Sequence, residues 1–121
     1  MAGQKILVVD DDRGILKLIV AMLRRGDYVP LAANGGQEAL ELHRAEHPEI
    51  VLLDLLMPGM DGFALLERLP VSLPVLMVSG TGDSRDRVAD NWRRGMAFLS
   101  KPFSSEEFLV ALAYVMWEAD R

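Results

Sequence analysis

Three short runs of consecutive apolar residues constrain the fold of this chain more than any other feature of its sequence. They are Ile6–Val9, Ile50–Leu53 and Val75–Val78. Each run is rich in Val, Ile or Leu and does not alternate with polar residues, which is typical of a strand buried on both faces of a sheet. Such strands occur in parallel sheets with helices on both faces, so the runs predict an α/β protein.

Segments with the helical spacing of apolar residues separate these strands. In the first segment the apolar residues are Ile15, Leu18, Ile19, Met22 and Leu23. Asp12 can cap the amino end of this helix, and Gly26-Asp27 ends it. Further helices are expected over Gly35–Glu46, Phe63–Leu69 and the mostly polar segment Arg85–Arg94.

A capping box opens the last helix. Ser104 is followed three residues later by Glu107, a pattern in which each side chain accepts a hydrogen bond from the backbone N–H of the other residue. The apolar stripe that follows is formed by Phe108, Leu109, Leu112, Val115 and Met116. We expect this stripe to pack on the core, and we expect Trp117, one turn after Ala113, to join it.

Two less regular segments complete the alternation. Tyr28–Ala32 predicts a second strand, in which Pro30 favours a position at the sheet edge because proline donates no backbone hydrogen bond. Ala97–Ser100 predicts the last strand. The order (βα)5 implies a doubly wound, five-stranded parallel sheet with right-handed crossovers. A chain of 121 residues has room for one such domain, which is expected to span residues 1–121.

Charge and composition exclude several classes of protein. The 18 acidic residues outnumber the 13 basic ones, so direct binding to nucleic acids or membrane surfaces is not expected. The chain has no cysteine, which excludes disulfides and thiolate metal sites. No apolar run approaches the roughly 18 residues of a membrane span, and the first residues lack the apolar stretch of a signal peptide. A soluble, cytoplasmic protein is expected.

Polar and charged residues follow four of the predicted strands. In chain order they are Asp10, Asp11, Asp54, Ser79 and Lys101. The carboxyl ends of parallel strands meet at one edge of the sheet, where ligands bind near the reversal of strand order, so these side chains should lie together. Crowded carboxylates repel one another unless a cation intervenes, and hard oxygen ligands suit Mg²⁺. A Mg²⁺ site is therefore predicted at that edge, with the neighbouring Asp12 only a helix cap.

Four motifs in this order resemble those of a known family. They are Val8–Asp11, Asp54–Gly62, Val78–Gly80 and Lys101–Phe103, and each lies at the end of a predicted strand. Together they resemble the receiver domain of two-component response regulators, over essentially the whole chain. The resemblance implies a flavodoxin-like, CheY-like fold. It also implies a signalling switch that a sensor histidine kinase or a histidine phosphotransfer protein phosphorylates.

The resemblance assigns metal and phosphoryl chemistry to particular residues. Asp54 would be the phosphoacceptor. Mg²⁺, for which Mn²⁺ could substitute, would be bound by Asp11, by Asp54 and by the backbone carbonyl of Leu56. Asp10 would hold the metal mainly through water.

Other residues would bind the phosphoryl group, transmit the signal or shape the site. Ser79 would donate a hydrogen bond to a phosphoryl oxygen, and Lys101 would pair with the same group. Phe98 would couple this change to a surface made by the last two helices and the last strand. Structural roles would belong to Pro58, Gly62 and Pro102.

Two positions depart from the common pattern of the family. Phe98 stands where many relatives carry Tyr, so a step that needs a buried hydroxyl is excluded, although the ring can still rotate. Leu56, two residues after the phosphoacceptor, cannot orient an attacking water, and slow self-dephosphorylation is expected. The domain would assist its own phosphorylation and dephosphorylation without being an enzyme for other substrates.

Other functions fit the residues less well. The main alternative is a degenerate receiver that acts as a constitutive protein-interaction module, against which the intact Asp54, Ser79 and Lys101 argue. A phosphohydrolase of the haloacid-dehalogenase type needs a second acid where this chain has Leu56. A flavin-binding protein needs a Ser/Thr-Gly-rich phosphate loop after the first strand. Downstream, the sequence leaves open a separate partner or a fused output domain, and a monomer or a phosphorylation-dependent dimer.

Overall fold

Five parallel strands form one sheet in the computed structural model, which describes residues 3–57, 60–80, 92 and 95–119. The order across the sheet is β2-β1-β3-β6-β7. Each strand is parallel to its neighbours, which confirms the predicted doubly wound, flavodoxin-like topology. The strands are β1 Lys5–Val9, β2 Val29–Ala33, β3 Ile50–Asp54, β6 Val75–Ser79 and β7 Met96–Ser100.

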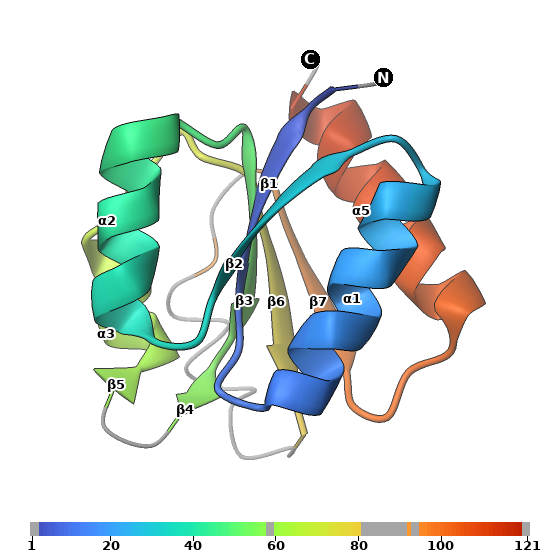
Figure 1. Cartoon of the computed structure of the whole chain (residues 1–121), viewed down its shortest axis with the longest axis horizontal. Helices are drawn as coiled ribbons and strands as arrows, with labels where there is room; N and C mark the ends of the chain where they lie inside the picture. Colours follow the sequence, from blue (N-terminus) through green and yellow to red (C-terminus); the bar gives the residue numbers. More distant parts are fainter. Residues whose placement is uncertain (1–2, 58–59, 81–91, 93–94, 120–121) are drawn as a thin grey trace.

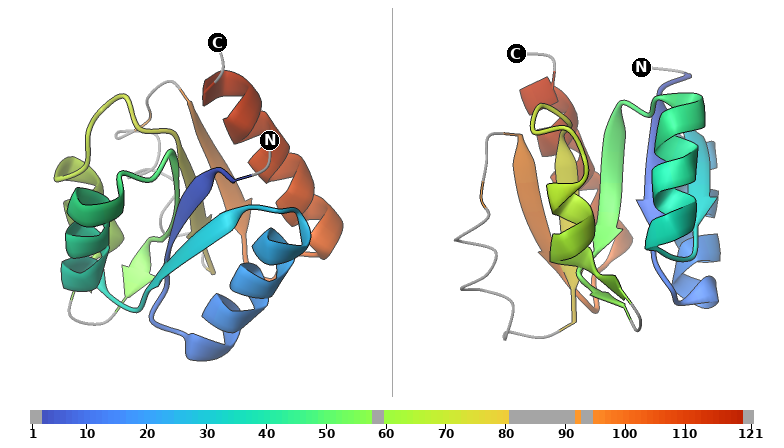
Figure 2. Two further views of the ribbon diagram at one scale, coloured as in Figure 1. Left: turned by 45° about the horizontal axis from the view of Figure 1, so that its top comes forward. Right: turned by 90° about the vertical axis from the view of Figure 1, so that its left-hand side faces the viewer.

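Helices cover both faces of this sheet (Figure 1). One face is covered by α1, Arg13–Arg25, and α5, Ser105–Ala119. The opposite face is covered by α2, Gly36–Glu46, and α3, Gly62–Glu67. The two further views in Figure 2 show the same three layers.

Alternate residues of the central strands belong to two separate cores. In β1, Leu7 and Val9 pack in the layer of α2 and α3. Ile6 and Val8 pack in the layer of α1 and α5. All four side chains are buried, which is the physical reason why this strand is a continuous apolar run. Pro30 lies in β2 at the sheet edge, as predicted.

Helix α1 agrees with the sequence prediction at its cap and in its core, but not at Leu18. The side-chain oxygen of Asp12 accepts hydrogen bonds from the backbone N–H groups of Gly14 and Ile15, at 2.9 Å and 3.2 Å. Ile19 is buried, whereas Leu18, which belongs to the same series of apolar residues at helical spacing, is exposed. Consecutive side chains of a helix point about 100° apart, so adjacent apolar residues cannot all face the core.

Helix α5 begins at the predicted capping box. The backbone N–H of Glu107 donates to Ser104 Oγ, and that of Ser104 donates to Glu107 Oε1, each at 3.0 Å. The predictions that Leu109 and Trp117 belong to the core are wrong, because both side chains are exposed. The core residues of this helix are Phe108, Leu112 and Val115.

A short hairpin that was not predicted from the sequence follows β3. Its antiparallel strands are β4 Leu56–Met57 and β5 Met60–Asp61. Strands of two residues are too short to leave a periodic pattern, so they could not be predicted. Of the predicted helix Arg85–Arg94, only Trp92 is among the described residues, and its side chain is exposed. No helix in the described part of the chain is long and apolar enough to span a membrane.

Replacement of Gly62 by Ala tests the close packing between α3 and the end of β3. A Cβ atom at Gly62 would lie 2.6 Å from the carbonyl oxygen of Asp54 and 2.6 Å from the Cα of Leu55, which are backbone atoms that cannot turn away. Gly62→Ala should therefore lower the free energy of unfolding by about 2 to 3 kcal/mol in urea denaturation.

The control for this prediction is Gly35→Ala, because a Cβ at Gly35 would meet no atom within 4 Å. Gly35 is the N-cap of α2, where alanine costs less than about 1 kcal/mol relative to glycine. Equal losses of stability in the two variants would contradict the packing argument.

Candidate functional site

The predicted site residues meet at the carboxyl edge of the sheet. The chain passes from β1 to β2 on one side, while β3 pairs with β1 on the other, so the strand order reverses between β1 and β3. Asp10 follows β1, and Asp54 ends β3. Ser79 ends β6, and Lys101 follows β7. An open parallel sheet binds ligands at such a reversal, because the diverging connections leave a crevice there.

Hydrogen bonds of both its backbone and its side chain hold Asp10 in one orientation. Its backbone N–H donates to the carbonyl of Ala33 at 3.2 Å. Its Oδ1 atom accepts from the backbone N–H of Asp12 at 2.9 Å. Only 2% of Asp10 is exposed. The second carboxylate oxygen, Oδ2, is directed to Lys101.

Lys101 lies between two buried carboxylates. Its Nζ atom is 3.1 Å from Asp10 Oδ2 and 3.4 Å from Asp54 Oδ2. Partial burial of the ammonium lowers the pKa of Lys101, but the hydrogen bond to Asp10 and the charges of Asp54 and Asp10 outweigh burial. The net effect raises the pKa of Lys101 above its ordinary value, so the side chain is a cation at neutral pH.

Three carboxylates converge beside this cation. One oxygen from each of Asp10, Asp11 and Asp54 lies within 4.8 Å of the others. Asp10 and Asp54 are buried, whereas Asp11 is exposed, so the cluster is open to solvent on one side. Three negative charges exceed the single charge of Lys101. A hard divalent cation would offset this excess, and carboxylate oxygens are the ligands that such a cation prefers.

Backbone hydrogen bonds hold the remaining strand ends in register. The N–H of Lys101 donates to the carbonyl of Ser79 at 2.8 Å, and the N–H of Leu55 donates to the carbonyl of Val78 at 3.0 Å. Ser79 is fully buried. A displacement of Ser79 would therefore also displace the backbone of Lys101, whose ammonium group is the cation of the site.

The hairpin after β3 keeps the segment that follows Asp54 close to the site. The N–H of Gly62 donates to the carbonyl of Leu55 at 3.0 Å, and Asp61 Oδ1 accepts from the N–H of Phe63 to cap α3. Leu56, which follows Leu55 in the chain, belongs to β4. A side chain at Gly62 would collide with the backbone of Asp54 and Leu55.

Phe98, Pro102 and Pro58 are the other residues singled out from the sequence. Phe98 is partly buried in β7 and packs against the core of α2 and α3. Pro102 is exposed, and the Lys101-Pro102 peptide bond is cis. Pro58 lies outside the described residues.

An apolar hollow beside the cation was not anticipated. Its volume is about 450 Å³, and it is lined by Ile15, Leu18, Gly80, Lys101, Pro102 and Phe103. The helical spacing of Leu18 suggested a core position, and no pattern in the sequence connects α1 with the segment after β7. The structure shows that Leu18 instead borders the approach to Lys101.

Comparison with known proteins supports the resemblance that the sequence motifs indicated. The family model described as the response regulator receiver domain matches residues 6–113. A probable transcriptional regulator, ycf27, from Porphyridium aerugineum is 32% identical over 123 residues, covering 100% of this chain and 51% of the relative. Sporulation initiation phosphotransferase F from Bacillus subtilis is 33% identical over 111 residues, covering 88% of this chain and 89% of that protein.

A solved structure has the same fold over nearly the full length. The CheY-like response regulator receiver domain protein from Methanospirillum hungatei superposes with a TM-score of 0.87 at 25% identity, covering 98% of each chain. The present chain spans only about half the length of the ycf27 relatives that it matches.

Stability in metal-free buffer tests the charge balance of the site. Asp11→Asn removes one of three crowded carboxylates and should raise the free energy of unfolding by about 0.5 to 1.5 kcal/mol. Lys101→Met removes the cation between Asp10 and Asp54 and should lower the same free energy by about 1 to 3 kcal/mol. Urea denaturation in the presence of EDTA measures both changes.

Lys5→Met is a matched control for Lys101→Met. The ion pair of Lys5 with Glu46 has a similar N–O distance, 3.2 Å, but its side chains are much more exposed than those of Lys101 and Asp10. An exposed ion pair contributes less than about 1 kcal/mol. Destabilisation by Asp11→Asn would contradict the proposed repulsion.

Proposed function

The chain belongs to the family of response regulator receiver domains, and on that premise we propose that it is a phosphorylation-controlled signalling switch whose phosphoacceptor is Asp54. The observation that carries the proposal is the position of Lys101 Nζ, 3.4 Å from Asp54 Oδ2 beside a cluster of three carboxylates. The phosphodonor would be a sensor histidine kinase or a histidine phosphotransfer protein.

The donor set fits Mg²⁺, with Mn²⁺ as a substitute. Asp10, Asp11 and Asp54 offer oxygens close enough to share one ion, and Leu56 offers a backbone carbonyl after β3. Mg²⁺ prefers one or two carboxylates together with phosphate oxygens and water. When bound, the ion would neutralise part of the charge on the transferred group.

Asp54 is suited to be the nucleophile because its strand and its neighbours hold it in place. The ionised carboxylate would attack phosphorus in line with the bond to the donor. An O–P bond forms, the bond from phosphorus to the donor nitrogen or oxygen breaks, and the donor leaves with that electron pair. The product is an acyl phosphate. Lys101 and the hydroxyl of Ser79 would then bind phosphoryl oxygens.

The same contacts suggest how phosphorylation changes the surface. A phosphoryl group adds about −1.5 to −2 charge and three acceptor oxygens, which would draw Ser79 and Lys101 toward Asp54. Ser79 pairs with Ser100 in the sheet, and its carbonyl accepts from Lys101, so the shift would reach β7. Phe98 in β7 would reorient, and the surface formed by β7 and the last two helices would change its affinity for a partner.

The wider role of the chain follows from this proposal. Residues 1–121 would form one receiver domain that acts in the cytoplasm on a separate downstream protein or on a fused output domain. It would assist its own phosphorylation and dephosphorylation without catalysing the reaction of other substrates. A degenerate receiver is the second candidate. The site argues against it, because all three carboxylates and the lysine are present.

Asp54→Asn should abolish phosphorylation by acetyl phosphate. The amide is uncharged, so its oxygen is a much weaker nucleophile toward phosphorus, while its shape is nearly unchanged. Incorporation is measured by intact-protein mass spectrometry in the presence of Mg²⁺, and EDTA should abolish it in the wild-type chain. The control is Asp12→Asn, which preserves the helix cap and should be labelled normally. Labelling of another residue in Asp54→Asn would refute the assignment.

Binding of beryllofluoride separates an active receiver from a degenerate one. This phosphoryl mimic needs the acceptor carboxylate, the metal and the lysine together. We expect Mg²⁺-dependent binding, detected by fluorine NMR, and its loss in Asp54→Asn. Failure of the wild-type chain to bind would favour the constitutive interaction module.

The phosphoryl group should be lost slowly, over many minutes. Leu56 follows Asp54 by two residues, and its side chain cannot orient a water for attack on phosphorus. Leu56→Gln supplies a polar side chain and should shorten the lifetime of the acyl phosphate about fivefold or more. The decay is followed by mass spectrometry after removal of acetyl phosphate. A wild-type lifetime of seconds, little changed in the variant, would contradict the prediction.

A further inference from the structure

Tyr28 and Met116 form a contact that joins two remote parts of the chain outside the candidate site. The hydroxyl of Tyr28 donates a hydrogen bond to the sulfur atom of Met116, Sδ, at 3.3 Å. Tyr28 directly precedes β2, whereas Met116 lies near the carboxyl end of α5. A thioether sulfur is a weak acceptor that oxidants convert into a sulfoxide, so the contact holds an oxidisable atom at a defined position.

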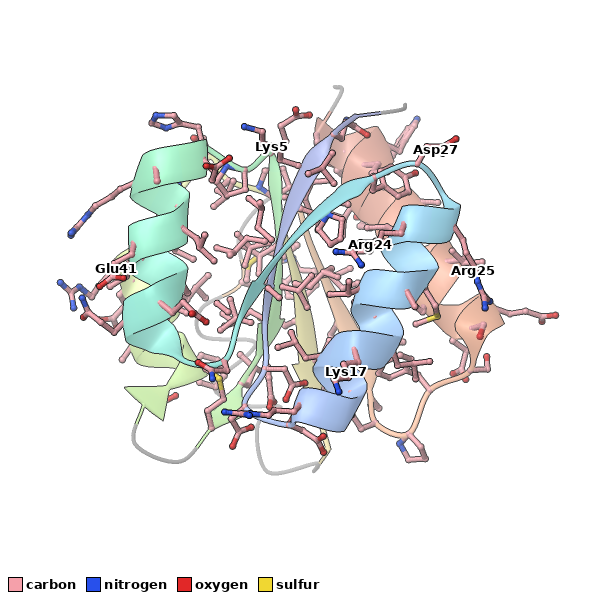
Figure 3. The ribbon with its side chains drawn as sticks, in the orientation of Figure 1. Lys5, Lys17, Arg24, Arg25, Asp27 and Glu41 are labelled. Atoms are coloured by element: carbon pink, nitrogen blue, oxygen red, sulfur yellow. The ribbon has the colours of Figure 1, made fainter. Side chains whose placement is uncertain are left out.

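The turn between α1 and β2 fixes the ring of Tyr28. The backbone N–H groups of Gly26 and Tyr28 both donate to the carbonyl of Leu23, at 3.0 Å and 3.1 Å. A Cβ atom at Gly26 would lie 2.9 Å from Cε2 of Tyr28, so the ring packs directly on this glycine. In Figure 3 the labels of Arg25 and Asp27 mark the turn. The turn therefore positions the hydroxyl of Tyr28 against α5.

Met116 is one of the methionines that a small oxidant can reach. Of the methionine side chains that the structure describes, Met57, Met77 and Met96 are buried, whereas Met22 and Met116 are partly exposed. Both of the accessible ones pack against the core beneath α1 and α5. Within the described residues, Met116 is the one of these two whose sulfur accepts a hydrogen bond.

We propose that Met116 is a site of oxidation by hydroperoxides and that Tyr28 controls the stereochemistry of its sulfoxide. The sulfur attacks one oxygen of hydrogen peroxide, so that an S–O bond forms and the O–O bond breaks. The second oxygen leaves as hydroxide, takes the proton of the S–OH group and becomes water. The sulfur is oxidised by two electrons, and the peroxide is reduced by two.

The hydrogen bond from Tyr28 makes the two lone pairs of the sulfur unequal. The lone pair that accepts this bond is blocked, so the other one attacks the peroxide. A sulfoxide sulfur is chiral, and attack through one lone pair produces one of the two epimers in excess. Tyr28 is thus a positioning residue that makes no bond to the oxidant.

Oxidation would weaken the attachment of α5. A sulfoxide is polar, whereas the thioether of Met116 packs against the apolar core beneath α5. Because neither Tyr28 nor Met116 belongs to the carboxylate cluster, this proposal does not depend on phosphorylation of Asp54.

Oxidation of the folded chain with dilute hydrogen peroxide tests the proposal. Peptide mapping by tandem mass spectrometry should find Met116 oxidised, whereas the buried Met77 and Met96 should react only after unfolding. The epimer ratio is measured in the digest with methionine sulfoxide reductases A and B, each of which reduces one epimer. We expect one epimer to exceed the other about threefold or more in the wild-type chain.

Two variants change the hydroxyl in different ways. Tyr28→Phe keeps the ring and removes the hydroxyl, and it should at least halve the epimer excess at Met116. Gly26→Ala keeps the hydroxyl but displaces the ring, and it should reduce the excess in the same direction. Gly26 has a φ of −90°, which alanine also adopts. The control is Tyr114→Phe, because Tyr114 is exposed on the same helix and its loss of a hydroxyl should leave the ratio unchanged.

The melting temperature after peroxide treatment tests the effect on α5. It should fall by about 2 to 5 °C in the wild-type chain. Met116→Leu should remove most of this fall, and Met22→Leu should retain most of it, since leucine replaces methionine with little change in volume.

Three results would overturn the proposal. Met116 that reacts no faster than Met77 in the folded chain would exclude the site. Equal amounts of the two epimers in the wild-type chain, or an excess unchanged in Tyr28→Phe, would exclude the role of Tyr28. A fall in melting temperature that persists in Met116→Leu would exclude the effect on α5.

Discussion

The contact of one ammonium with two buried carboxylates is the interaction on which the rest of this molecule depends. Asp10 and Asp54 lose nearly all contact with water, and a buried carboxylate is costly unless a cation or hydrogen-bond donors offset its charge. Lys101 supplies that cation across 91 positions of the chain. The contact can form only when β1, β3 and β7 are all in register. Assembly of the sheet and assembly of the site are therefore one event.

Apolar packing and the candidate site lie in different parts of the same sheet. The strands are buried on both faces and supply the apolar contacts, whereas the carboxyl edge gathers like charges that oppose folding in the absence of a metal. Hydrogen bonds also connect this edge to the segments from which α1 and α5 begin. Asp10 accepts a hydrogen bond from the N–H of Asp12, and Asp12 caps α1. The carbonyl of Ser79 accepts a hydrogen bond from the N–H of Lys101, which lies shortly before α5. Helices α1 and α5 thus both begin close to the proposed phosphorylation site.

Sequence patterns predicted those parts of the fold that depend on local chemistry or on burial of both faces. Continuous apolar runs identified β1, β3 and β6, and the caps at Asp12 and Ser104 identified where α1 and α5 begin. The parallel arrangement of the strands and the meeting of Asp10 with Lys101 at one sheet edge followed from general rules for parallel sheets. Periodicity failed at Leu18, Leu109 and Trp117, because adjacent apolar residues in a helix satisfy more than one face. The β4–β5 hairpin was missed because its strands have two residues each.

The amino-acid sequence by itself determined the alternation of strands and helices. It also determined which charged residues lie at strand ends. Both depend on local propensity and on the pattern of apolar residues. Only the tertiary structure decided how these ends combine. It placed Lys101 against Asp10 and Asp54 and left the cluster open to solvent at Asp11. It also left one apolar face of α5 exposed, with Leu109, Val110 and Trp117 outside the core. The physical reason is that distances between remote segments, and the choice of which helix face is buried, depend on how the whole sheet packs.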